Sequence, residues 1–201
     1  MPLAWPRVTP VWQSGSVTVH TPRRAGRVLL VDSEGRLLLF EGFDPARPDH
    51  RYWFTPGGGL DPGETPAQGA ARELAEETGL RLAPAELGDP VWSETVEFPF
   101  DGVRYRQEQE FFLVRVDAWE VDTAGFDAVE RATVSGYRWW PAAELATTDQ
   151  RYYPENLPVV LVRALAGAGP ADPGDGPPPS GDPVPAQAGE VVGPADGGTP
   201  C

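Results

Sequence analysis

The sequence predicts one α/β domain, because strand signals and helix signals alternate along the middle of the chain. Two pairs of apolar runs flank turn residues, at 33–36 and at 101–102, and both pairs indicate β-hairpins. A capped helix is expected between them from about residue 66 to residue 78, and an amphipathic helix at 155–166 closes the domain. The length of 201 residues suits a single domain with one core.

The remaining elements follow from short apolar runs that are bounded by turn residues. The expected strands are, in chain order, 28–31, 37–40, 52–54, 91–100, 103–116 and 137–140. Pro56–Gly59 is too rich in glycine to continue a strand, so a turn is expected there. The apolar side of the closing helix consists of Leu157, Val160, Leu161 and Leu165.

Capping residues mark both ends of the central helix. Thr65 is a suitable N-cap, Pro66 suits the first helical position, and Gln68 completes a capping box with Thr65. Gly79 readily adopts the left-handed conformation that ends a helix, so the helix is expected to stop at about Thr78.

The two faces of this helix differ in chemistry. The small and apolar stripe that is expected to face the core consists of Ala67, Ala71, Leu74 and Thr78. Glu73, Glu76 and Glu77 fall within an arc of about 100° on the helix surface. Three like charges on one face are unfavourable without a counter-charge, and carboxylate oxygens suit hard cations such as Mg²⁺ or Mn²⁺. The competing interpretation is an ordinary solvated helix face.

The joint spacing of glycine, arginine and glutamate decides between these interpretations. The fixed identities are Gly58, Glu64, Arg72, Glu73, Glu76, Glu77 and Gly79, with Leu74 and Leu80 at aliphatic positions. At a usage of roughly 7% per residue type, chance agreement at all of them is on the order of 10⁻⁸ per starting position. The stretch resembles the Nudix box, Gly-x5-Glu-x7-Arg-Glu-aliphatic-x-Glu-Glu-x-Gly-aliphatic, and every fixed position matches.

The resemblance to the Nudix hydrolase family implies a Nudix-type α/β/α sandwich with a mixed β-sheet. It implies a hydrolase in which water attacks phosphorus and cleaves the diphosphate linkage of a nucleoside diphosphate derivative or a nucleoside triphosphate. The implied cofactor is Mg²⁺, with Mn²⁺ as an alternative. The implied metal ligands are Glu73, Glu76, Glu77 and the carbonyl of Gly57 or Gly58. The implied catalytic residues are Glu73 as general base or further ligand, Glu76, and Arg72, which orients a glutamate, while Glu64 braces the loop.

An acidic residue outside the box is expected to complete the site, because family members often use such a glutamate as metal ligand or base. Glu130, in a predicted loop, is the first candidate for a metal ligand, and Glu108 and Glu110 on a predicted strand compete for the role. Trp53 and Glu108 are the expected substrate-binding residues. The aromatic residues available to stack on a base are Trp53, Phe98, Tyr105 and Trp140, for which core packing is the alternative interpretation.

The formal charge of −14 disfavours nucleic acid or an anionic membrane as a main partner. A small phosphorylated nucleotide remains the expected partner, because a bound cation reverses the local field. Cys201 is the only cysteine, so an internal disulfide is excluded and a cytoplasmic location is expected. Residues 1–7 lack the apolar core of a secretory signal. The resemblance also makes a homodimer possible, because members of the family are often dimers.

Three other functions share this fold or motif. A nucleotide-sensing Nudix domain would bind without turnover, and the intact glutamates argue against it. An isopentenyl diphosphate isomerase needs a core cysteine, which Cys201 at the chain end does not supply. An RNA decapping enzyme would need a basic groove, which the net charge disfavours. The marks of specific substrate subfamilies outside the box are not matched, so the sequence leaves the nucleotide open.

Composition divides the chain into three parts. Residues 1–21 form an extension that contains Trp5 and Trp12, and residues 22–166 form the Nudix hydrolase domain. From 167 to 201 there are nine Gly and nine Pro, no aromatic residue and no basic residue. Such a segment buries too little apolar area to offset the cost of ordering its backbone, so a disordered acidic tail is expected.

Overall fold

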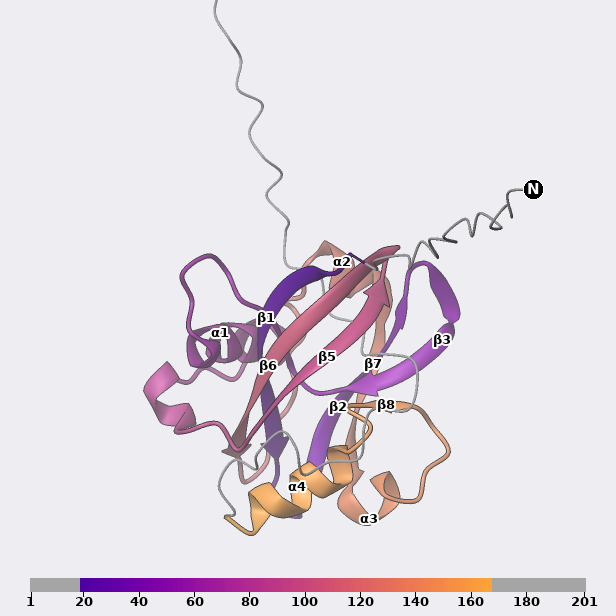
Figure 1. Ribbon diagram of the computed structural model, residues 1–201. Helices are drawn as coiled ribbons and strands as arrows, with labels where there is room; N and C mark the ends of the chain where they lie inside the picture. The colour runs from indigo at the N-terminus through magenta and orange to yellow at the C-terminus, as the bar shows by residue number, and fades with distance from the viewer. Residues whose placement is uncertain (1–18, 168–201) are drawn as a thin grey trace, which may run out of the picture.

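Strand β1 (Thr21–Val31) organises the sheet in the computed structural model, which describes residues 19–167 (Figure 1). Strand β6 (Val103–Arg115) runs parallel to β1 along its whole length. On the other side of β1, β4 (Gly57–Gly59) pairs antiparallel with the middle of β1, residues 25–27, and β2 (Arg36–Asp44) pairs with its last residue. Strands β1 and β2 therefore pair only at the end of β1, and β4 pairs with β1 where β2 does not.

Among residues 19–167 the sheet has eight strands in the order β5-β6-β1-β2-β3-β8, with β4 against β1 and β7 against β2. The other strands are β3 (Arg47–Phe54), β5 (Trp92–Phe100), β7 (Val134–Pro141) and β8 (Tyr152–Tyr153). The helices are α1 (Pro66–Thr78), the 3₁₀ turn η1 (Pro84–Leu87), α2 (Ala128–Thr133), α3 (Ala142–Leu145) and α4 (Leu157–Leu165). Parallel pairing of β1 with β6 and of β3 with β8 makes the sheet mixed, as predicted.

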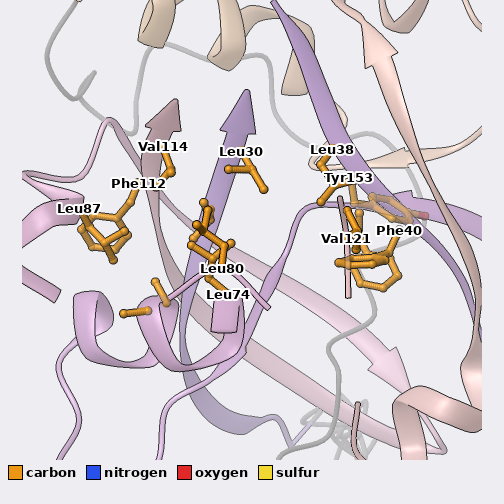
Figure 2. Close-up of a cluster of buried hydrophobic side chains, with 14 of the residues drawn as sticks. Leu30, Leu38, Phe40, Leu74, Leu80, Leu87, Phe112, Val114, Val121 and Tyr153 are labelled. Carbon is orange, nitrogen blue, oxygen red and sulfur yellow. The ribbon is translucent and has the colours of Figure 1, made fainter. Parts of the chain in front are cut away.

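Hydrophobic cores lie on both faces of the sheet. Leu74 of α1 and Leu80 after it lie near Leu30 of β1 and Phe112 of β6 (Figure 2). The second core includes Leu29, Leu37, Leu39, Trp140, Leu157, Val160 and Leu161, and it places α4 against the opposite face. Because both faces are covered, the run 28–31 is wholly buried without alternation. Layers of helix, sheet and helix confirm the α/β fold class.

Close backbone contact fixes α1 beside β1. A Cβ atom added to Gly26 would lie 2.2 Å from the carbonyl oxygen of Pro66 and 2.8 Å from the amide nitrogen of Ala70. Only glycine permits this approach, since the obstructing atoms belong to the helix backbone. The glutamates of α1 are thereby brought beside β4.

The predicted central helix is confirmed at both ends. Helix α1 runs from Pro66 to Thr78, the Thr65–Gln68 capping box is present, and Gly79 is left-handed with φ of 75°. Both hairpins are also observed, and the second turns at Asp101-Gly102.

Two expectations about local structure require correction. The chain does leave β3 after Phe54, but Gly57–Gly59 form strand β4 instead of a turn, because β1 presents backbone groups with which they pair. Glu130 does not lie in a loop. It lies on the short helix α2, whose N-cap is Asp127.

The expected extension at 1–21 and the expected tail at 167–201 lie almost wholly outside the described residues, so their boundaries stay predictions. Cys201 also lies outside them. Within residues 19–167, no helix is both long enough and apolar enough to cross a membrane.

Candidate active site and metal centre

Three buried carboxylates meet between α1 and α2. One oxygen from each of Glu73, Glu77 and Glu130 lies within 4.8 Å of the others, and the residues are only 7%, 0% and 5% exposed. Glu130 is held in place because the Asp127 amide donates to its Oε2 at 2.7 Å. Helices α1 and α2 are separated by the whole β5–β6 hairpin in the chain, so the fold assembles this cluster from distant segments.

Burial makes ionisation of the cluster costly, and Arg72 and Arg27 offset only part of that cost. Burial raises the pKa of Glu77 well above its usual value, and the carboxylates of Glu73 and Glu130 raise it further. Burial also raises the pKa of Glu73, and it raises that of Glu130 to about 7. Within the described part of the chain, the buried Oε1 of Glu77 has no hydrogen-bond partner. A buried carboxylate costs free energy unless its oxygens are bonded, and within that part of the chain Glu77 has one oxygen without a partner. A divalent cation such as Mg²⁺ binds several oxygen ligands at once, so the three carboxylates suit such an ion.

Strand β4, which consists of Gly57–Gly59 and is called the glycine strand below, lies against these carboxylates. The amide of Gly57 donates to Glu77 Oε2 at 2.6 Å. Gly57 has φ of 116°, a conformation that other residues rarely adopt. A Cβ atom added to Gly58 would lie 2.6 Å from Glu73 Oε1. The first two glycines of β4 therefore let backbone atoms reach the cluster directly.

Arg72, on the more exposed side of α1, connects this helix to Gly59 and to the loop that contains Glu64. Its Nε and Nη2 donate to the two oxygens of Glu64, each at 3.0 Å, and Nη2 also donates to the Gly59 carbonyl at 2.9 Å. Its Nη1 donates to Glu73 Oε1 at 2.9 Å and to Glu76 Oε2 at 3.2 Å. The Arg72 bonds and the backbone bond from Asp61 lower the pKa of Glu64. These bonds place Arg72 between Glu64 and Glu73, and the bracing role of Glu64 and the orienting role of Arg72 stay predictions.

Glu76 differs from the other two glutamates of the predicted arc. Its side chain is 48% exposed and pairs with Arg72, and it is not a member of the close group of three carboxylates. A role for Glu76 as ligand or catalytic residue stays a prediction.

Arg27 belongs to the site although the sequence analysis did not select it. Its fully buried Nη1 donates to the carbonyls of Thr55 at 3.1 Å and Gly57 at 2.6 Å. Burial lowers the pKa of Arg27, and the charges of Glu77 and Glu73 act in the opposite direction and raise it. Arg27 thus orients the Gly57 carbonyl, which is one of the predicted metal ligands. The available signal was a single arginine inside the apolar run 25–31.

The predicted substrate-binding residues lie on two other strands. Trp53 on β3 donates through Nε1 to Gln150 Oε1 at 2.6 Å, and its ring lies 5.1 Å from that of Trp140. Glu108 on β6 is exposed and lines a cavity of about 230 Å³ with residues that include Arg24, Glu94 and Gln109. Neither belongs to the carboxylate cluster, so their substrate contacts stay predictions. Of the other aromatic candidates, Phe98 and Trp140 are buried in the cores.

The motif, the buried carboxylates and the sandwich agree with a comparison against protein-family models, in which the NUDIX domain matches residues 21–160. This chain belongs to the NUDIX family. Several curated relatives of this NUDIX chain are named RNA pyrophosphohydrolase, including the two described next. That of Roseobacter denitrificans is 37% identical over 132 residues, covering 59% of this chain and 76% of the relative. That of Novosphingobium aromaticivorans is 32% identical over 146 residues, covering 67% of this chain and 80% of the relative.

Solved structures show the same fold at low identity. The MutT protein of Methanosarcina mazei Go1 superposes on this NUDIX chain with a TM-score of 0.53 at 20% identity, covering 74% of this chain and 96% of that one. A second structure is a bifunctional NMN adenylyltransferase/ADP ribose pyrophosphatase of Francisella tularensis, solved with AMP and a manganese ion. Its TM-score is 0.51 at 19% identity, and the match covers 75% of this chain and 43% of that one. These structures show the fold alone. The family model and the curated relatives make the chain a Nudix hydrolase, and the Nudix family generally uses a divalent metal.

Proposed function

We propose that this Nudix hydrolase cleaves the diphosphate linkage of a nucleotide in a reaction that depends on a divalent cation, Mg²⁺ or Mn²⁺. The observation that carries the proposal is the meeting of Glu73, Glu77 and Glu130, three buried carboxylates of which one oxygen is unpartnered among the described residues. A bound divalent cation would neutralise phosphate oxygens and lower the pKa of the attacking water. The small-nucleotide substrate follows from the family and from the acidic charge.

The protein supplies the ligands and holds them in place. Glu77 and Glu130 would hold the cation through their free oxygens, since Glu77 Oε2 is bound to the Gly57 amide and Glu130 Oε2 to the Asp127 amide. The Gly57 carbonyl, oriented by Arg27, would add a further ligand. Removal of the ion would leave like charges facing one another in a buried site.

Glu73 is the proposed general base. Arg72 fixes its Oε1, which leaves Oε2 to accept a proton. The water oxygen forms a bond to phosphorus, and its proton passes to Glu73. The bond from phosphorus to the bridging oxygen breaks, and the departing phosphate retains the electron pair. The products are two phosphate esters, or one ester and inorganic phosphate or pyrophosphate.

The first test is a panel of nucleotides with Mg²⁺, with Mn²⁺ and with a chelator. It should contain nucleoside triphosphates, nucleoside diphosphate sugars, ADP-ribose and dinucleoside polyphosphates, with all products identified. Glu73→Gln and Glu77→Gln are expected to lower kcat/KM by at least about 10²–10³-fold, the scale of losing one electrostatic group in an active site. Glu155→Gln, at an exposed position before α4, serves as the matched control and should be active. Unchanged turnover in chelator and in both site variants would refute the proposal.

RNA with a 5′-triphosphate end is a second candidate substrate, because curated relatives carry the name RNA pyrophosphohydrolase. The charge of −14 argues against a long RNA contact, although a 5′ end needs only its terminal phosphates and first bases. The two candidates are separated by comparing kcat/KM for GTP and for a short 5′-triphosphate RNA at two salt concentrations. A higher kcat/KM for the RNA at both would favour the second candidate.

A further inference from the structure

A row of buried polar side chains crosses β5 and β6 and takes no part in the chemistry above. Gln107 Nε2 donates to Gln109 Oε1 at 2.8 Å, and Gln109 Nε2 donates to Glu94 Oε1 at 2.7 Å. The row ends at Trp92, whose Nε1 donates to Glu94 Oε2 at 3.2 Å. Gln107 and Gln109 are 0% and 2% exposed. We call Glu94, Gln109 and Gln107 the polar row.

The hydrogen bonds of the polar row fix which way each amide points. Both oxygens of Glu94 receive N–H groups, so Gln109 must present its NH₂ to Glu94 and its oxygen to Gln107. Gln107 in turn donates to Gln109, which leaves its own oxygen at the open end. Among residues 19–167, this buried Gln107 Oε1 has no hydrogen-bond partner. An unsatisfied buried acceptor costs about 1–3 kcal/mol, so a missing donor is indicated.

The open end of the row lies within the reach of a nucleotide from the third glycine of β4. Gln107 is the Cα partner of Arg23 on β1, and Ala25, two residues on, is the partner of Gly59 on β4. Two strand spacings of about 4.8 Å and two residues of about 3.3 Å rise separate Gln107 from Gly59 by about 12 Å. An extended nucleotide with its phosphates at the glycine strand spans a comparable distance to its base.

Arg23 lies between the polar row and the glycine strand. Strand partners project from the same face, so the Arg23 and Gln107 side chains are neighbours. A Cβ atom added to Gly59 would lie 2.6 Å from Arg23 Nη2, and Arg23 Cζ is 5.8 Å from the centre of the Tyr105 ring. Burial, and then the charge of Arg27, lower the pKa of Arg23 to about 10, so it stays cationic at neutral pH. The Arg23 guanidinium is therefore a cationic donor beside the open end of the polar row, on a long and partly exposed side chain.

We propose that Gln107 and Arg23 recognise the base of the nucleotide substrate. Gln107 Oε1 accepts an N–H from the edge of the base, and Arg23 donates to the neighbouring acceptor atom of the same base. Rotation of the Arg23 side chain admits the base to the buried oxygen. The inference rests on the proposed function, because it requires the phosphates to lie at the glycine strand.

The test measures base preference in variants that keep the volume of the side chain. Gln107→Met and Arg23→Met are compared with the wild type on ATP, GTP, CTP and UTP, with kcat/KM determined for each. For the preferred base, Gln107→Met should lower kcat/KM by about 10- to 100-fold, the scale of one buried hydrogen bond. Values for the other bases should stay within about twofold, so the preference collapses. The control Val114→Ala, a core truncation in the same strand β6, should lower Tm and leave the preference intact.

Three results would overturn the inference: equal loss for all four bases in Gln107→Met, a lower Tm with unchanged preference, or a wild type without base preference. If the wild type hydrolyses no nucleotide, the proposed function has failed. Binding of the four nucleoside monophosphates by calorimetry then tests base recognition separately. A preference that Gln107→Met removes would support the site, and equal or absent binding would refute it.

Discussion

The glutamates around α1 occupy two contrasting environments. Glu64 and Glu76 lie on the side of Arg72, where guanidinium N–H groups bond both of them and solvent is near. Glu77 and Glu130 lie on the buried side, where each has one oxygen bound to a backbone amide and both have raised pKa values. Glu73 stands between the two groups and touches Arg72. The difference separates carboxylates that Arg72 neutralises from buried carboxylates for which we propose an external cation.

The largest expected effect is on metal affinity. Glu77→Gln should weaken Mn²⁺ binding by at least about 10- to 100-fold, the loss that removing even an indirect partner of a ligand causes. Glu64→Gln should leave the Mn²⁺ affinity within a few-fold, because Glu64 bonds Arg72 and the loop instead. Isothermal titration calorimetry measures both. Equal weakening by the two substitutions would contradict the division into two environments.

The same comparison predicts an unusual pH dependence in the metal-free protein. The folded protein raises the pKa of Glu130 from 4.5 to about 7, chiefly through burial, and raises that of Glu77 for the same reason. Between these values the folded state binds more protons than the unfolded state, so stability falls as pH rises from about 4.5 to 7. In a chelator, Tm should be higher at pH 5.5 than at pH 8.

Two further measurements sharpen this pH prediction. Mg²⁺ should raise Tm more at pH 8 than at pH 5.5, because it binds the ionised carboxylates. Glu130→Gln should flatten the dependence in chelator, since it removes one of the titrating groups. A Tm in chelator that rises from pH 5.5 to pH 8 would show that the buried carboxylates are neutralised by the protein itself.

The sequence predicted the parts of this site that depend on local rules. Helix α1 was located because its caps lie within the segment itself, and the Nudix spacing identified Arg72, Glu73 and Glu77 together. Glu130 was selected only by its order along the chain, and its helix was missed. Asp127 and Glu130 form a capping box, which was a usable local signal for α2.

The missed residues depend on strand register, which no local rule supplies. Arg27 reaches Gly57 because β4 pairs with β1, and the sequence analysis expected a turn where β4 lies. Gln107 and Arg23 meet because β1 and β6 are parallel partners separated by more than eighty residues. Arg27 was visible as a single arginine inside an apolar run, whereas Arg23 and Gln107 lie in polar stretches. Only the paired strands show what these residues face.

A smaller effect is expected from the bonds of Arg72. Arg72→Lys keeps the charge but cannot reproduce the paired bonds to Glu64 together with those to Gly59 and Glu73. The free energy of unfolding should fall by about 1–3 kcal/mol, measured by urea titration. Arg81→Lys, at an exposed position after α1, is the control and should have no measurable effect. An unchanged stability in Arg72→Lys would mean that charge alone, without the fork geometry, holds the loop.

The smallest effect is expected at a second arginine–glutamate pair, which joins β7 to α3. Arg138 Nη2 lies 2.7 and 2.8 Å from the two oxygens of Glu144, and both side chains are more than 40% exposed. Glu144→Gln should cost at most about 1 kcal/mol, and less at high salt, because solvent and ions screen the pair. Arg138 would also keep its contact with the Trp140 ring, 4.3 Å from Cζ to the ring centre. A loss as large as that in Arg72→Lys would mean that burial beside the glycine strand does not set the strength of the Arg72 bonds.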